Sequence, residues 1–192
     1  MGGGYFSDAV TFLIQTIFGL YLVTVMLRFF LQQARVEFYY NPLARALVTL
    51  TNPALRPLRR LIPGFKGIDW AAIVLMLLVQ LTETLVIVLI HGHLPRPPGL
   101  LIVALAELIS TGIYVYLFAI LIQVIASWLA PQQYNPVLEL VERLTEPLMR
   151  PVRPLIPPIG GLDFSALAVM VLLQLTVMLI VNPLRDVGYG LI

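Results

Sequence analysis

The segment YNPLARALVTLTNPALRPLRRLIPGFKGIDWAAIVLMLLVQLT, residues 40–82, returns at residues 134–176 as YNPVLELVERLTEPLMRPVRPLIPPIGGLDFSALAVMVLLQLT. The two copies align without a gap at an offset of 94 residues, and 20 of their 43 positions are identical. Each copy follows one long apolar stretch and ends inside another. We therefore predict two related units, residues 1–96 and residues 97–192.

The composition places the apolar stretches in a membrane. Hydrophobic residues make up 59% of the chain and charged residues 11%, whereas soluble domains have about 45–50% and 25%. Four stretches, at about residues 9–30, 69–91, 100–130 and 163–182, are long enough for a helix to cross the hydrocarbon core. They lack the alternation of membrane strands. We predict an all-α membrane protein with four transmembrane helices, arranged as two parallel helix-loop-helix repeats.

The basic residues predict the orientation. Two crossings per unit give both units the same direction, so a pseudo-two-fold axis should run along the membrane normal. The loops at residues 33–67 and 131–162 carry nine of the 12 Lys and Arg residues, whereas the central connection has only Arg96 and the C-terminal tail only Arg185. By the positive-inside rule, both loops are cytoplasmic and both termini are extracytoplasmic.

Each loop opens with Asn-Pro, which is typical of an asparagine N-cap and a proline in the first helical turn. Apolar residues then follow at helical spacing, at Leu43, Ala46, Leu47 and Leu50 and at Val137, Leu140, Val141 and Leu144. This pattern predicts an amphipathic helix in the membrane interface or against the base of the bundle. Repeated prolines come next, so we expect this Pro/Arg-rich segment to be extended or a broken helix.

The repeated motif T-x-P-x-[LM]-R-P-x-R supports two interpretations. Its arginines serve either ordinary positive-inside anchoring or a specific surface for anionic lipid or an acidic partner. The aspartates before the second and fourth spans are either helix caps or functional carboxylates. The candidate docking residues are Asn41, Pro42, Thr51, Pro53, Arg56, Pro57, Arg59 and Asp69 in the first copy, with Asn135, Pro136, Thr145, Pro147, Arg150, Pro151, Arg153 and Asp163 in the second.

The candidate intramembrane polar residues are Gln80, Glu83, Glu107, Gln123 and Gln174. Acids inside a membrane are costly and often functional, but the position that matches Glu83 in the second copy is Val177. Gln80 and Gln174 do match, and we expect a hydrogen bond between helices that holds the units together. The chain has no cysteine and no catalytic motif, so we expect no enzyme, no cofactor, no metal site and no direct contact with nucleic acid.

The repeated pattern NP-x8-T-x-P-x-[LM]-R-P-x-R, followed by G-[IL]-D and an apolar helix, resembles the YggT family of bacterial and plastid membrane proteins. The resemblance covers both units and implies a multi-pass protein of the bacterial inner membrane. The resemblance does not specify a biochemical activity. Relatives have been linked to osmotic stress survival, to cofactor attachment in a plastid cytochrome complex, and to nucleoid distribution or division.

Two functional hypotheses follow. We expect a membrane scaffold or assembly factor that docks an unknown membrane protein partner or anionic lipid through its basic cytoplasmic loops. The alternative is a small channel or transport accessory protein whose polar path is lined by Glu83, Gln80, Gln174 and Glu107. A homo-oligomer would give that path more room than four spans alone.

Overall fold

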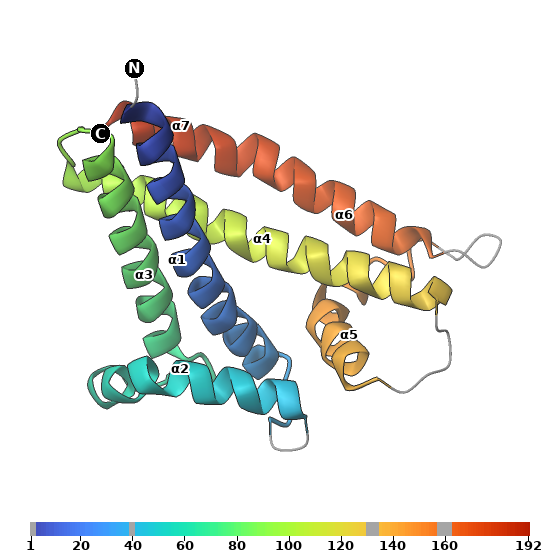
Figure 1. Cartoon of the computed structure of the whole chain (residues 1–192). Helices are drawn as coiled ribbons and strands as arrows, with labels where there is room; N and C mark the ends of the chain where they lie inside the picture. The colour runs from blue at the N-terminus through green and yellow to red at the C-terminus, as the bar shows by residue number, and fades with distance from the viewer. Residues whose placement is uncertain (1–2, 39–40, 130–134, 157–162) are drawn as a thin grey trace.

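The computed structural model describes residues 3–38, 41–129, 135–156 and 163–192, and it is built from helices (Figure 1). In chain order these are α1 (Gly3–Gln33), α2 (Pro42–Leu61), α3 (Trp70–Ile90), α4 (Pro97–Leu129), α5 (Pro136–Met149), α6 (Phe164–Thr176), the π-helix η1 (Val177–Val181) and α7 (Asn182–Gly190). The segments Tyr5–Gln33, Trp70–Ile90, Pro97–Leu129 and Phe164–Gly190 are long and apolar enough to cross a membrane. The prediction of an all-α membrane protein with four spanning helices is confirmed.

The fourth span is longer than the sequence predicted. It continues through α6, η1 and α7, so Arg185 lies in the helix and not in a C-terminal tail. Pro183 has no N–H and would collide with the carbonyl four residues earlier in a regular α-helix. The wider turn of η1, in which the Asn182 N–H bonds to the Val177 carbonyl, accommodates this proline.

The helices form two pairs that meet at one end of the molecule. Figure 1 shows α1 beside α3, with α2 lying across their far ends, and α4 beside α6 and α7. The pairs meet close to both chain termini and diverge towards α2 and α5. Helix α5 lies in the opening, where it contacts α1, α2, α4 and α6.

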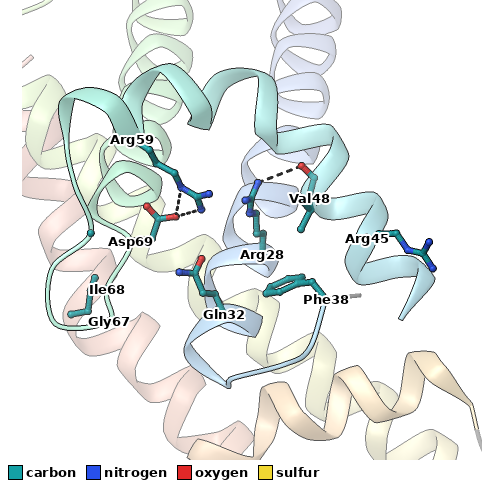
Figure 2. A pocket seen from close by; sticks show the side chains of 10 residues that line it. Arg28, Gln32, Phe38, Arg45, Val48, Arg59, Gly67, Ile68 and Asp69 are labelled. Atoms are coloured by element: carbon teal, nitrogen blue, oxygen red, sulfur yellow. Dashed lines mark hydrogen bonds and ion pairs between the residues drawn. The ribbon is translucent and has the colours of Figure 1, made fainter. Parts of the chain in front are cut away.

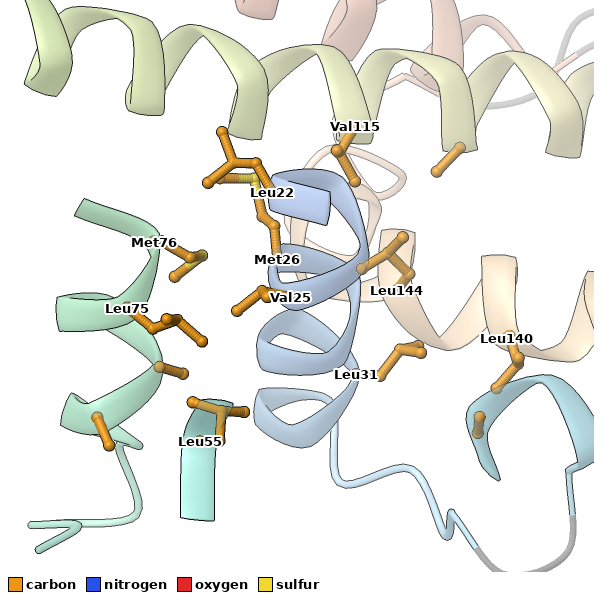
Figure 3. Packing of buried hydrophobic residues seen from close by; sticks show 14 of the residues in the cluster. Leu22, Val25, Met26, Leu31, Leu55, Leu75, Met76, Val115, Leu140 and Leu144 are labelled. Carbon is orange, nitrogen blue, oxygen red and sulfur yellow. The ribbon is translucent and has the colours of Figure 1, made fainter. Parts of the chain in front are cut away.

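The main core joins both halves of the chain. Val25 of α1, Leu55 of α2, Met76 of α3 and Val115 of α4 belong to one buried cluster, and Leu144 of α5 completes it (Figure 3). The loop helix of the second copy, α5, therefore packs on the first pair of apolar helices. The two halves share this core, and a smaller buried cluster, Ile120, Met149, Ala166 and Val169, lies within the second half.

The prolines of the first copy do not break the helix, contrary to the sequence prediction. Helix α2 runs through Pro53 and Pro57, which are exposed and four residues apart on one face. The carbonyls that lose their partners, those of Thr49 and Pro53, therefore also lie on an exposed face, while Thr51 and Leu55 hold the opposite face in the core. In the second copy the helix ends at Met149, and the chain then forms turns up to residue 156, as expected for a broken helix.

Candidate functional site

Asparagine caps start both loop helices, as predicted. The Asn41 Oδ1 accepts hydrogen bonds from the backbone N–H groups of Leu43 (3.0 Å) and Ala44 (3.4 Å). In the second copy the Asn135 Oδ1 accepts one from Val137 (2.9 Å). The Asn41 Nδ2 also donates to the Pro136 carbonyl at 2.7 Å, so the N-termini of α2 and α5 are bonded to each other.

A tight turn places Asp69 beside Arg59. Lys66 and Gly67 both have positive φ, 53° and 79°, and the flanking Phe65 and Ile68 exchange two backbone hydrogen bonds, as in a type I′ hairpin. The chain that leaves this turn brings the buried carboxylate of Asp69 against the Arg59 guanidinium, which donates from Nε (3.1 Å) and Nη2. Asp69 also caps α3, and its ion pair and capping roles coexist.

Arg28 is a site residue that the sequence prediction missed. It is only 6% exposed, and its Nη1 donates to the Thr51 hydroxyl, to Asn52 Oδ1 (3.0 Å) and to the Val48 carbonyl (3.4 Å). These acceptors are neutral, and no carboxylate in the described part of the chain lies within ion-pair distance of Arg28. Arg28 is the first charged residue after a long charge-free stretch, 23 residues before the motif threonine. This position could have marked it as a candidate in the sequence.

Arg28 and Arg59 line a cavity of about 660 Å³ between α1, α2 and the turn before α3. Figure 2 shows these two side chains and Asp69 around the opening, with Arg45 towards the N-terminal end of α2. The residues that line the cavity include three arginines and one aspartate, whose carboxylate is already bonded to Arg59. The cavity therefore has an excess of positive charge and can hold a phosphate or carboxylate group.

The motif contacts recur in the second copy in a weaker form. Thr145 bonds to the neutral Gln123 at 2.7 Å, where Thr51 bonds to Arg28. Arg153 lies 3.9 Å from Asp163 and donates instead to Glu146 at 3.0 Å. Gly161 and Leu162, which precede Asp163 in the motif, lie outside the described residues.

The predicted docking residues divide by exposure. Asn41, Thr51, Asp69 and Thr145 are buried, Arg59 and Pro136 are half-buried, and Pro42, Pro53, Arg56, Pro57, Asn135, Pro147, Arg150, Pro151, Arg153 and Asp163 are exposed. The buried set holds the loops onto the spans. Arg45, Arg56 and Arg60 of α2 and Arg150 directly after α5 are exposed and have no acidic partner among the described residues, and the same holds for Arg35 and Arg96.

A second polar site lies inside the bundle. Gln80 donates to Glu83 at 3.1 Å within α3, and both side chains are buried. They line a cavity of about 310 Å³ together with Glu107 of α4 and Tyr189 of α7. Glu107 in turn forms an ion pair of 2.7 Å with Arg185, which joins α4 to α7.

The expected bond between Gln80 and Gln174 does not form. Gln80 is bonded within its own helix, and Gln174 is half-buried without a side-chain hydrogen bond in the part of the chain that the structure describes. Gln174 and Gln123 also do not line the polar cavity. Of the five predicted intramembrane residues, the structure brings together Gln80, Glu83 and Glu107.

Comparison with known proteins places the chain in a family. The family model described as CCB3/YggT matches residues 7–90 and 102–184. An uncharacterised protein of Pseudomonas aeruginosa is 44% identical over 182 residues, covering 93% of this chain and 91% of the relative. The uncharacterised protein YggT of Escherichia coli is 32% identical over 181 residues, covering 94% of each. No solved structure matches. Both the family model and these relatives cover most of the sequence, and the chain belongs to the CCB3/YggT family.

Proposed function

We propose that this protein is a non-enzymatic membrane scaffold or assembly factor, which docks an acidic partner or anionic lipid on the cytoplasmic side of the bacterial inner membrane. The observation that supports this proposal is a group of exposed arginines in the repeat motif and its helices that have no acidic partner among the described residues. Three lie on α2, Arg45, Arg56 and Arg60, and Arg150 follows α5. We call these four side chains the arginine surface. It adjoins the positively charged cavity at Arg28, because Arg45 also lines that cavity.

The distribution of apolar residues over the faces of α2 supports a position in the membrane interface. Its buried face carries Thr51 and Leu55, and an exposed apolar face carries Leu50 and Leu61, which are 62% and 80% exposed. An apolar face of this kind enters the acyl region and holds the polar face of the helix at headgroup level. The arginines are then presented where phosphate or carboxylate groups can reach them.

The expected electrostatic binding free energy is large enough to hold a partner and small enough for salt to reverse the binding. A basic residue near an anionic surface contributes about 1 kcal/mol, so four contribute about 4 kcal/mol, or roughly a thousandfold in affinity. Ions of physiological salt screen charges beyond about 8 Å. A partner held in this way should dissociate from the arginine surface at high salt.

The test is photo-crosslinking in native membranes from position 49, because Thr49 is exposed on the polar face of α2. We expect a discrete adduct that high salt abolishes. Replacing all four residues of the arginine surface with glutamine should abolish it too, at matched membrane levels. The control is Arg96→Gln, which removes an exposed arginine outside the repeat loops. An adduct that survives the fourfold replacement would refute the docking role.

The polar cavity favours a second candidate, a channel or transport accessory protein. Glu83 is a buried carboxylate whose one hydrogen-bond partner in the described chain is neutral, and it faces the cavity with Glu107. Glu83→Gln removes the charge with little change of shape, and the same change at the exposed Glu142 is its control. Survival of hypo-osmotic shock should fail in the arginine-surface variant if the scaffold hypothesis holds. Failure in Glu83→Gln alone supports transport.

A further inference from the structure

The apolar faces of the two loop helices converge on one crevice. A cavity of about 590 Å³ lies between α1, α2, α4 and α5. Leu43 and Leu50 of α2 line it from one side, and Leu140 and Leu144 of α5 from another. The two stripes therefore line this space from two sides, and Leu140 and Leu144 belong to the buried core as well. We call it the inter-unit crevice.

The dimensions of the crevice match one lipid chain. Its lining along α4 runs from Thr111 to Ile122, about 16 Å at 1.5 Å per residue, which is about half of the 30 Å hydrocarbon core. If each carbon of an acyl chain takes roughly 30 Å³, the volume of one water molecule in the liquid, a sixteen-carbon chain fills about 480 Å³. A spanning helix 30 Å long and 10 Å wide would need about 2,400 Å³, so the crevice is far too small for one.

A polar pocket adjoins the interfacial end of the crevice. It has a volume of about 320 Å³ and shares Leu140 with the crevice. Arg35 and Arg143 contribute two positive charges to its lining, and Glu37 and Glu139 contribute two negative charges. Arg143 and Glu139 lie 3.8 Å apart. The charges balance, which suits a headgroup that contains both a phosphate and an amine.

We propose that one zwitterionic glycerophospholipid is bound between the two halves of the molecule. An acyl chain fills the inter-unit crevice, the phosphate lies between Arg35 and Arg143, and the amine faces Glu37 and Glu139. The lipid comes from the leaflet on the side of α2 and α5. It supplies apolar contacts that the diverging helix pairs do not make with each other. This site does not depend on the arginine surface and does not require the scaffold hypothesis.

The first test is native mass spectrometry of the whole protein, released from membranes in mild detergent. The unmodified protein should retain one phosphatidylethanolamine per chain. The double substitution Ala46→Trp and Val137→Trp places two indole rings in the crevice, because both residues line it, and should lower retention at least tenfold. The control pair, Ile17→Trp and Leu172→Trp, adds the same rings at exposed apolar positions and should retain the lipid. Equal retention in both double variants would overturn the proposal.

The second test changes the headgroup pocket without touching the packing. Arg35→Gln with Arg143→Gln should weaken retention about thirtyfold, since each basic contact contributes roughly fivefold. This variant decides the question if the tryptophan variant fails to fold. Supplied with equal amounts of phosphatidylethanolamine and phosphatidylglycerol, the unmodified protein should retain the former. Unchanged retention in the arginine variant, a preference for phosphatidylglycerol, or no stoichiometric lipid would each contradict the proposed site.

Discussion

Removing the charge of Asp69 should destabilise the protein far more than removing the charge of Asp163. Both aspartates cap the helix that follows them, through hydrogen bonds to the N–H groups of Ala72 and Ser165. Asparagine caps as well as aspartate, so the Asp→Asn change keeps the cap and removes the ion pair alone. The two copies of the motif thus provide a matched pair of experiments within one chain.

The structure sets the size of the two effects. The Asp69 side chain is 5% exposed and its partner Arg59 is 35% exposed. Breaking a fully buried pair costs about 3–5 kcal/mol, and the partial exposure of Arg59 reduces this to about 1.5 kcal/mol. Asp163 is 49% exposed and lies 3.9 Å from Arg153, and such exposed pairs contribute less than about 0.5 kcal/mol.

Thermal unfolding in one detergent is the assay. For a chain of this size 1 kcal/mol shifts Tm by about 2–4 °C, so Asp69→Asn should lower Tm by about 3–6 °C and Asp163→Asn by less than about 2 °C. The Asp→Ala variants should each lose about 1 kcal/mol more, because the cap is also lost. If Asp163→Asn lowers Tm as much as Asp69→Asn, the ion pair is not what stabilises the first copy.

Three further predictions concern topology, symmetry and helix packing. The chain has no native cysteine, so single cysteines can report the orientation. A cysteine at the exposed Leu94 should be labelled from outside intact cells, and one at Thr49, on the polar face of α2, only after permeabilisation. The reverse pattern would invert the proposed orientation. In an experimental structure, superposing the two units should need a rotation of about 180° about an axis near the membrane normal, and an axis in the membrane plane would contradict the parallel repeat. A β-carbon on Gly188 would lie 2.6 Å from the Val103 Cγ2, so Gly188→Val should cost about 1–3 kcal/mol or more in unfolding experiments, whereas Gly190→Val, with nothing within 4 Å, should be nearly neutral.

The spans and the helix caps could be predicted from the sequence because both depend on local patterns. Apolar length alone defines the four spanning helices, and the Asn-Pro pairs at residues 41–42 and 135–136 specify where α2 and α5 begin. The course of α2 through Pro53 and Pro57 could not be predicted in this way. Whether a proline ends a helix depends on the face it occupies, and burial of Thr51 and Leu55 decides that face only after folding.

The candidate sites depend on contacts between distant segments, which the sequence does not reveal. Arg28 belongs to the first site because α2 lies across the end of α1 and brings Thr51 to it. Glu83 and Glu107 share a cavity because α3 packs on α4, and Gln174 is excluded because its side chain does not reach that space. Equivalent positions in the repeat were therefore a poor guide to shared chemistry inside the membrane.

The two copies of the motif share a contact geometry but differ in charge. The bond from the preceding span to the motif threonine is present twice, with Arg28 in the first copy and the neutral Gln123 in the second. A guanidinium held by neutral acceptors retains its full positive charge, so it adds to the field of the first cavity without being neutralised by an ion pair. The first copy should therefore be the one that attracts an anionic group. In the second copy the hydrogen bond between Thr145 and Gln123 also holds the loop against the span. The apolar face of α5 packs between the two pairs of spans. Exchanging the residue types, with Arg28→Gln and Gln123→Arg, should accordingly move anion binding from the first loop to the second.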